Sequence, residues 1–270
     1  MTQSRNTAGL EAVLEYIEDE LSFAASYYNE AYLDRRVTAR LRRTDAETYR
    51  EYLRVLRDDE DEQEELLNSL SINVTSFFRN PEMWERLRPV LRDLTDEHRT
   101  VRLWSAPCSD GREPYSLAML ALDDPEIDAR RIEITATDIS DRALDIAREG
   151  VYETTQTTDI DEELELLDDY SPYVEQDDDC FRVRESVREM VSFRRHDLIR
   201  DEPLGGFELV MCRNLLIYIS TEYKEPILET LDGALVDRGY LVIGMTETLS
   251  PTYKSRYESV DKESRIHRRL

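Results

Sequence analysis

The residues best placed to do chemistry follow two short apolar runs in the middle of the chain. The first run, residues 101–106, leads into small residues, then Gly111, and then Glu113 at the start of a helix. In a doubly wound sheet the loop after the first strand lies at the ligand crevice, and a helix N-terminus offers free N–H groups. A single glycine does not make the dinucleotide fingerprint, which argues against a pyrophosphate ligand. The loop therefore predicts either a close backbone approach to a cofactor or an ordinary strand–helix turn.

Asp138 stands directly after the second apolar run, residues 132–137. An acid at this place can accept hydrogen bonds from both hydroxyls of a ribose. It can equally serve as the N-cap of the helix that follows. Taken together, the two segments favour a nucleoside-containing cofactor without requiring phosphate binding.

A polar pair, Arg213 and Asn214, follows a later apolar run at residues 207–211, and Tyr218 comes shortly after the pair. The carboxyl end of a further parallel strand is where a substrate would meet the cofactor. The other interpretation is a charged strand end followed by a core tyrosine.

A fourth polar set lies before all of these runs. Asn73, Thr75 and Arg79 surround a pair of phenylalanines at residues 77–78, which we expect to pack in a core. The three polar side chains could line a crevice where a helical region meets the sheet, or they could belong to a capped helix end.

Two sequence patterns describe the elements that must position these segments. Residues 10–88 have apolar residues at helical spacing and no glycine, which predicts a helical bundle with one helix starting near Asp45. From about residue 100, short β-branched or aromatic runs alternate with helical stretches, which predicts a mainly parallel sheet with helices on both faces. The expected strands are residues 101–106, 132–137, 190–193, 207–211, 240–244, 257–260 and 264–267, and the expected helices are residues 115–122, 141–148 and 222–235. Residues 151–188 interrupt this alternation with an acidic helix at 160–167 and two strand-like pieces, which indicates a small insertion.

The composition excludes several classes of function. The 270 residues carry a net charge of −25, with 60 acidic and 35 basic side chains, so we expect no nucleic-acid partner. The acids are spread over the whole chain, which favours adaptation to high salt over an acidic interaction tail. No run of about 18 apolar residues is present, and residues 1–8 lack a signal-peptide pattern, so we expect a cytoplasmic protein without membrane insertion. The scattered cysteines and histidines form neither a disulfide framework nor a metal-ligand pattern. Nothing in the pattern indicates an oligomeric state.

Residues 35–43 contrast with this acidic background, because they contain five arginines and no acid. The arginines are Arg35, Arg36, Arg40, Arg42 and Arg43. Leu33, Val37 and Leu41 should form the buried stripe of the same helix. We expect Arg36, Arg40 and Arg43 to fall together on another face, spaced four and three residues apart. This face could dock an acidic partner, or it could be a solvated face paired with the bundle's own acids.

Four motifs occur in order along the chain. They are N-x-T-x-F-F-R at residues 73–79, S-x-G-x-E-P-Y-S at 109–116, A-T-D-I at 136–139 and C-R-N-L-L-I-Y at 212–218. Together they resemble the chemotaxis receptor methyltransferases of the CheR family, from about Tyr27 to the end of the chain. The resemblance implies S-adenosyl-L-methionine as the methyl donor. It also implies, as methyl acceptors, the glutamate-rich helices of a methyl-accepting chemotaxis receptor, whose side-chain carboxylates become methyl esters during adaptation.

The resemblance implies an α/β fold. A Rossmann-like S-adenosylmethionine-dependent methyltransferase domain at residues 86–270 follows a small all-α docking domain at residues 1–85. A β subdomain is inserted at residues 151–192, with strands expected at 181–184 and 191–193. In some family members this subdomain grips a peptide at the receptor's C-terminus through a longer, Gly-rich loop. Here residues 175–180 are short, acidic and Gly-free, which argues against peptide tethering.

The resemblance carries over to site residues position by position. The cofactor-binding positions are Asn73, Thr75, Arg79, Glu113, Asp138, Asp197, Leu198, Arg213 and Asn214. Asp197 stands where the family usually has asparagine near the adenine, and an aspartate can accept from the adenine amino group but cannot donate as asparagine does. Arg79 and Tyr218 resemble the catalytic residues closest to the methyl transfer, and the arginines of residues 35–43 resemble the receptor-docking helix.

The expected chemistry fits a site without a general base. A glutamate carboxylate is ionised at neutral pH, with a reference pKa of about 4.3. The cofactor supplies an activated methyl group, so the protein must mainly align the two reactants and exclude water. One alternative is a small-molecule O-methyltransferase, which would not explain the basic helix. Another is a non-catalytic adaptor that only binds receptor, and the intact cofactor positions argue against it.

Overall fold

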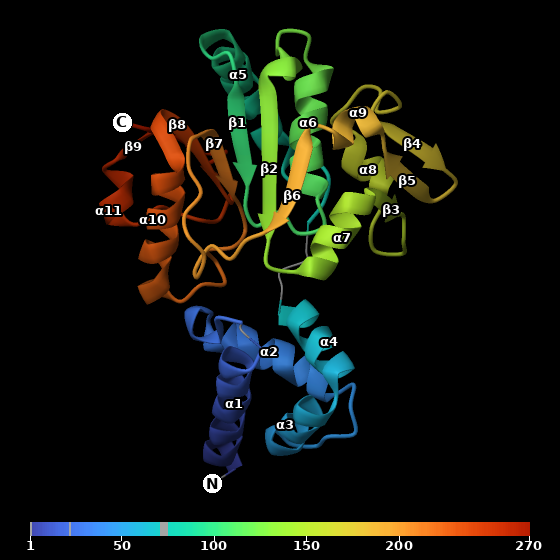
Figure 1. Ribbon diagram of the computed structural model, residues 1–270, viewed down its shortest axis with the longest axis vertical. Helices are drawn as coiled ribbons and strands as arrows, with labels where there is room; N and C mark the ends of the chain where they lie inside the picture. Colours follow the sequence, from blue (N-terminus) through green and yellow to red (C-terminus); the bar gives the residue numbers. More distant parts are fainter. Residues whose placement is uncertain (1, 22, 71–74) are drawn as a thin grey trace. The chain divides into compact units, whose positions relative to one another are not determined.

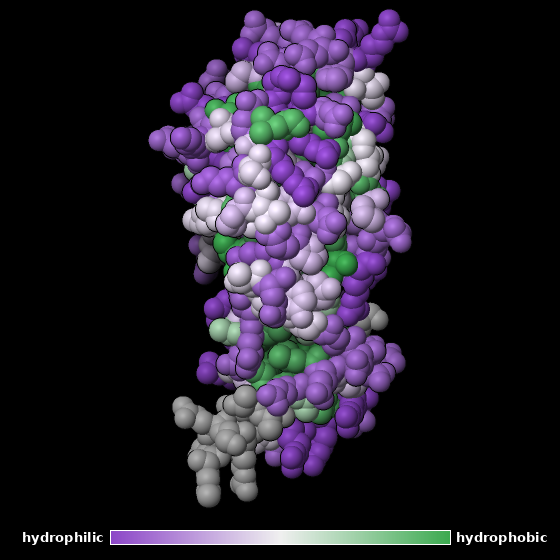
Figure 2. All heavy atoms as spheres, turned by 90° about the vertical axis from the view of Figure 1, so that its left-hand side faces the viewer, coloured by the Kyte–Doolittle hydropathy of each residue, from purple (hydrophilic) through white to green (hydrophobic). Residues whose placement is uncertain are grey.

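The computed structural model describes residues 2–21, 23–70 and 75–270, and the chain divides into two compact units. The first unit is Met1–Ile72 together with Tyr218–Lys224, and the second is Asn73–Ile217 with Glu225–Leu270. Most of the surface shown in Figure 2 is hydrophilic, in keeping with the high content of charged residues. None of the described helices is long and apolar enough to cross a membrane.

The first unit is a bundle of helices, as the sequence predicts (Figure 1). Its helices are α1 (Thr2–Asp19), α2 (Glu30–Leu41), α3 (Tyr49–Asp58) and α4 (Glu60–Leu70), with a short 3-10 turn at Ala25–Tyr27. The late segment Tyr218–Lys224, which contains the 3-10 turn Thr221–Tyr223, completes the unit. Ile219 forms an antiparallel bridge with Tyr28 there. The core of the bundle contains Leu10, Val13, Ile17, Leu33, Val37, Tyr52, Leu56, Leu66 and Leu70.

The expected helix start near Asp45 is wrong by a few residues. Helix α3 begins at Tyr49, because Thr48 is its N-cap and the Thr48 side chain accepts a hydrogen bond from the backbone N–H of Glu51. A threonine hydroxyl at this position satisfies one of the free N–H groups of the first turn. Asp45 lies in the turn before this cap.

The second unit contains a seven-stranded sheet in the order β6-β2-β1-β7-β8-β10-β9 (Figure 1). The strands are β1 (Val101–Ser105), β2 (Ile132–Asp138), β6 (Val191–Arg195), β7 (Phe207–Cys212), β8 (Leu235–Ile243), β9 (Tyr257–Asp261) and β10 (Ile266–Arg269). The first five strands of this order are parallel to one another, and β10 runs antiparallel to both of its neighbours, β8 and β9. The mainly parallel sheet is therefore confirmed.

Helices precede or connect the strands of the large sheet. They are α5 (Pro81–Glu97), α6 (Arg112–Asp123), α7 (Asp141–Glu149) and α10 (Lys224–Ala234), with the short α11 (Pro251–Lys254) and the 3-10 turn Ala129–Arg131. Right-handed crossovers place α6 and α7 on one face of the sheet and α10 on the other, since the strand order runs in opposite directions from β1. The order reverses between β1 and β7, and ligands of open α/β sheets bind outside the carboxyl ends of the strands at such a point.

The expected insertion is a separate three-stranded antiparallel sheet in the order β3-β5-β4. It consists of β3 (Val151–Glu153), β4 (Val174–Asp177) and β5 (Cys180–Val183), with the short helices α8 (Ile160–Leu164) and α9 (Glu185–Arg188). The expectation that residues 191–193 belong to this subdomain is wrong. Val191 starts β6, which pairs in parallel with β2 as an edge strand of the large sheet.

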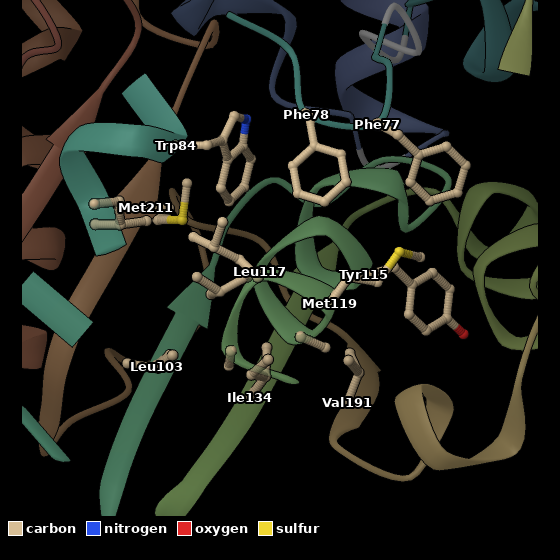
Figure 3. Close-up of a cluster of buried hydrophobic side chains, with 14 of the residues drawn as sticks. Phe77, Phe78, Trp84, Leu103, Tyr115, Leu117, Met119, Ile134, Val191 and Met211 are labelled. Carbon is tan, nitrogen blue, oxygen red and sulfur yellow. The ribbon is translucent and has the colours of Figure 1, made fainter. Parts of the chain in front are cut away.

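A large apolar core lies against helix α6 in the second unit. Figure 3 shows Phe77 and Phe78, which precede α5, beside Trp84 and the α6 side chains. The rings of Phe78 and Trp84 meet edge to face, with their centroids 5.7 Å apart. All three aromatic residues are at most 2% exposed. The phenylalanine pair therefore packs in a core, as expected, and fixes the segment that leads to Arg79.

Candidate functional site

The expected site residues of the second unit gather at the carboxyl edge of the parallel strands. Asp138 ends β2, Asp197 and Leu198 follow β6, and Arg213 and Asn214 follow β7. Because the carboxyl ends of parallel strands share one edge of a sheet, the chain brings these residues to the crevice side.

A buried chain of hydrogen bonds links three elements at this edge. The Ser105 hydroxyl at the end of β1 donates to Glu113 Oε1 over 2.9 Å. The second carboxylate oxygen of Glu113, which lies in the first turn of α6, accepts from Arg213 Nη1 over 3.1 Å. Arg213 is 5% exposed and Glu113 is 8% exposed, so this is a buried ion pair. Burial lowers the pKa of the Arg213 guanidinium, and the neighbouring Glu113 carboxylate opposes that shift.

Arg213 also fixes the segment that carries Arg79. Its Nη2 atom donates to the backbone carbonyl of Arg79 over 2.9 Å and to Asn80 Oδ1 over 2.8 Å. The same carbonyl accepts from the indole N–H of Trp84. Asn80 has a φ of 63°, in the left-handed region, where its short polar side chain is tolerated. The backbone at Arg79 is therefore held by two side-chain donors.

Asp138 is buried, with an exposure of 5%, and accepts hydrogen bonds from backbone N–H groups. Its Oδ2 atom accepts from Ser109 N over 2.8 Å and its Oδ1 atom from Ser140 N over 3.0 Å. Burial raises the pKa of the Asp138 carboxyl, although these backbone bonds oppose the rise. The alternative that Asp138 caps the following helix is wrong, because Ser140 is the N-cap of α7. The carboxylate instead joins the loop after β1 to the end of β2.

Gly111 has a backbone conformation and neighbours that favour a residue without a side chain. It is the N-cap of α6 with a φ of 90°, which an L side chain rarely adopts. A Cβ atom there would lie 2.7 Å from the Cβ of Ala147 on α7 and 3.2 Å from the ring of Phe193. The glycine therefore permits the contact between two helices. It brings α7, the helix after Asp138, against the loop after β1.

The remaining expected positions are less tightly bound into this network. Asp197 is partly exposed, and its Oδ1 atom accepts from the backbone N–H groups of Ile199 and Arg200, so it closes a turn after β6. Leu198 is buried beside it. Thr75 is partly exposed at the start of the described part of the second unit, and Asn73 lies outside the described residues.

The backbone at Asn214 is held by a residue that the sequence reasoning missed. Glu247, in the loop after β8, is 3% exposed. Its Oε2 atom accepts from Asn214 N over 3.1 Å and from Gly244 N over 2.6 Å, and its Oε1 atom accepts from Ile217 N over 3.3 Å. Burial raises the pKa of the Glu247 carboxyl, against the effect of these backbone bonds. Asp138 is the last residue of its strand, whereas Glu247 comes four residues after the end of β8, so the strand-end signal that indicates Asp138 does not extend to Glu247.

Tyr218 belongs to the first unit. Its backbone carbonyl accepts from the N–H of Asn29, and its ring lies 4.8 Å from the ring of Tyr32 on α2. The guanidinium groups of Arg35 and Arg36 lie 5.6 and 5.3 Å from the centroid of the Tyr32 ring. The expected catalytic tyrosine therefore shares its surroundings with two of the expected docking arginines.

The expectation for Arg40 is wrong. Arg40 is 9% exposed, its Nε donates to Glu62 Oε1 over 3.1 Å, and its Nη1 donates to Glu65. For this residue the alternative of pairing with the bundle's own acids is correct. The reason is its spacing: Arg40 follows Leu33 and Val37 at the four- and three-residue intervals of the buried stripe. Arg35, Arg42 and Arg43 are exposed and Arg36 is partly exposed, so these four remain on the surface of α2 and the turn after it.

An open doubly wound sheet with Asp138 at its crevice edge defines a Rossmann-like domain that fits a nucleoside-containing cofactor. The buried Ser109 hydroxyl, which has no hydrogen-bond partner among the described residues, adds a free polar atom beside Asp138. Comparison with known proteins identifies the family to which this Rossmann-like domain belongs. A family model described as "CheR methyltransferase, SAM binding domain" matches residues 73–266, and one described as "CheR methyltransferase, all-alpha domain" matches residues 8–71.

Curated relatives agree with the family models. The chain is 34% identical over 235 residues to a chemotaxis protein methyltransferase of Listeria monocytogenes, covering 86% of this chain and 87% of the relative. It is 32% identical over 198 residues to chemotaxis protein methyltransferase 1 of Vibrio cholerae, covering 68% of each. The chain belongs to the CheR methyltransferase family. It is an S-adenosylmethionine-dependent methyltransferase that acts in chemotaxis.

Proposed function

We propose that the methyl acceptors are glutamate side chains of a methyl-accepting chemotaxis receptor, which become methyl esters. The observation that carries the proposal is the fixed arginine segment at the crevice edge, where Arg213 and Trp84 both hold the backbone of Arg79. An arginine can orient a carboxylate, and an ionised carboxylate needs no base. Burial raises the pKa of the Cys108 and Cys212 thiols well above their usual range, so neither thiol suits nucleophilic chemistry.

The individual roles are proposed position by position from the family resemblance. When bound, S-adenosylmethionine supplies a methyl group on a positively charged sulfur that is already a good electrophile. We assign Asp138 to the ribose hydroxyls, and Asp197 and Leu198 to the adenine. Asn73, Thr75, Glu113, Arg213 and Asn214 complete the cofactor site in this proposal. Arg79 would orient the acceptor carboxylate, and Tyr218, four residues after Asn214 in the chain, would donate a hydrogen bond to it.

The docking proposal rests on the arginines that remain exposed or partly exposed. Arg35, Arg36, Arg42 and Arg43 present positive charge in a chain of net charge −25, and a glutamate-rich receptor helix is complementary to them. Arg40 is not among the proposed docking residues, because it forms an ion pair with Glu62 inside the bundle. We also propose a cytoplasmic location, which suits the three free cysteines.

A labelled-methyl assay with a receptor signalling domain tests the proposed function. We expect label from S-adenosylmethionine to enter the receptor and to leave as methanol in mild base, because a carboxyl methyl ester is base-labile. A receptor fragment whose candidate glutamates are changed to alanine should take up no such label. Base-stable label, or label only in an added metabolite extract, would contradict glutamate methylation.

The affinity for S-adenosylhomocysteine should rise with pH through the raised pKa of Asp138. The ionised carboxylate accepts from both ribose hydroxyls, whereas the protonated form has one acceptor fewer, so the affinity is lower below this pKa and higher above it. Calorimetric titrations between about pH 5 and pH 8 measure this slope. The variant Asp138→Asn should bind more weakly at neutral pH and lose the slope. A wild-type slope in this variant would remove Asp138 from the ribose site.

A further inference from the structure

Helix α3 carries a second set of arginines, on a face next to its buried side. Its core side is formed by Tyr49, Tyr52, Leu53 and Leu56. Arg50, Arg54 and Arg57 are all exposed and are spaced four and three residues apart, so they lie on one face of the helix. We call these three residues the α3 arginine face.

The unit's own acids neutralise the α3 arginine face only in part, since Arg54 attracts the Glu51 carboxylate electrostatically. Within the described part of the chain, none of its three arginines forms an ion pair, whereas Arg40 on α2 pairs with Glu62 and Glu65. The guanidinium carbon of Arg57 lies 5.8 Å from the centroid of the Tyr16 ring.

Two acids share the helix with this face, and one of them has a local role. Glu51 Oε2 accepts from the backbone N–H of Glu47, so its carboxylate is engaged in the turn before α3. Asp58 is the last residue of the helix. By the helical period of 100° per residue, both acids lie roughly 80–100° around the helix from Arg50, whereas Arg54 and Arg57 lie within about 40° of it. The arginines therefore form a stripe with the acids at one side.

The first turn of α3 is attached to α2. The Tyr49 hydroxyl hydrogen-bonds to Thr38 at 2.6 Å and donates to Asp34, and both of these residues are on α2. Arg42 and Arg43 lie in the connection between the last residue of α2, Leu41, and the first residue of α3, Tyr49. Arg50 therefore follows the basic residues of α2 and of the connection after it. It lies on a helix whose first turn is hydrogen-bonded to α2.

We propose that the α3 arginine face is a second contact for the glutamate-rich receptor helix, beside the exposed arginines of α2. This inference rests on the proposed function and extends its docking surface. A chain of net charge −25 repels an acidic partner as a whole, so binding needs local positive charge over more than one helix. Charges of this kind act mainly on the association rate and on its salt dependence.

Charge reversal of the whole face tests the inference. The triple variant Arg50→Glu, Arg54→Glu and Arg57→Glu should raise the KM for the receptor signalling domain about tenfold at low salt. The kcat and the affinity for S-adenosylhomocysteine should stay within about twofold, since none of these residues is in the proposed cofactor site. The rise in KM should shrink at high salt, because screening weakens exposed charge pairs.

A matched control reverses three exposed arginines of the second unit. Arg99, Arg182 and Arg238 change the net charge by the same amount when all become glutamate, and their variant should keep the wild-type KM within about twofold. Equal KM values for the two triple variants would overturn the α3 contact while leaving receptor methylation by the wild type intact. No base-labile label with the wild type would instead overturn the proposed function. If the triple glutamate variant loses cofactor affinity through misfolding, the test uses the variant in which Arg50, Arg54 and Arg57 are all changed to alanine. A wild-type KM for the receptor in that variant would overturn the inference.

Discussion

Replacing Arg213 with methionine is expected to lower the free energy of unfolding of the second unit by about 3–5 kcal/mol. The change leaves the Glu113 carboxylate buried without its cation and removes the donor that holds Arg79 and Asn80. Breaking one side of a buried ion pair is costly because the remaining charge keeps its desolvation penalty. Both tryptophans, Trp84 and Trp104, lie in the second unit, so tryptophan fluorescence in urea reports on this unit alone.

A double variant separates the loss of charge from the loss of packing. Arg213→Met combined with Glu113→Gln removes both charges and should regain part of the lost stability. Arg213→Lys should be intermediate, because an ammonium cannot reach Glu113, Asn80 and the carbonyl of Arg79 as a guanidinium does. A single methionine variant within about 1 kcal/mol of the wild type would mean that the ion pair does not organise this edge.

Glu247→Ala should have an effect of similar size at the neighbouring strand end. The backbone N–H groups of Asn214, Gly244 and Ile217 would lose a buried acceptor, and each unsatisfied donor costs about 1–3 kcal/mol. We expect the free energy of unfolding to fall by about 3 kcal/mol, near the lower end of the sum over three donors, because solvent entering the vacated space would satisfy part of them. Cofactor affinity should fall as well, because Asn214 would no longer be held.

Amide hydrogen exchange gives the sharpest measurement of this role. The amides of Asn214, Gly244 and Ile217 should lose protection in Glu247→Ala, while amides in the middle of β1 should keep theirs as long as the unit stays folded. Glu258→Ala, which removes an exposed glutamate on β9, is the matched control and should change neither stability nor exchange. Unchanged protection of the three amides in the Glu247 variant would refute its positioning role.

The parts of the fold that depend on local pattern could be predicted from the sequence. The runs before Asp138 and before Arg213 are short and apolar, and both are strands of the parallel sheet. The sequence predicts that the Phe77–Phe78 pair packs in a core, and it does. In these cases the residue types and their spacing carry the information, because a buried parallel strand has few other sequences available to it.

The parts that depend on distant partners could not be predicted. The spacing of Arg40 from Leu33 and Val37 is compatible with the buried side of α2, but nothing near it in the sequence identifies its partner Glu62, which lies on another helix. Glu113 was expected at the cofactor, and its ion pair joins it to Arg213, a residue 100 positions later in the chain. Glu247 stands in a polar loop that looks like any other surface turn. Only the arrangement of the strands brings these charges together.

The late segment of the first unit has a consequence for biosynthesis. Residues 218–224 supply Ile219 to the bridge with Tyr28 and Ser220 to hydrogen bonds with the carbonyls of Tyr27 and Tyr28. A ribosome releases these residues only after β1, β2, β6 and β7 of the large sheet have been made. The helical bundle is thus encoded first but completed late, and a polypeptide truncated after residue 72 would lack the piece that closes it.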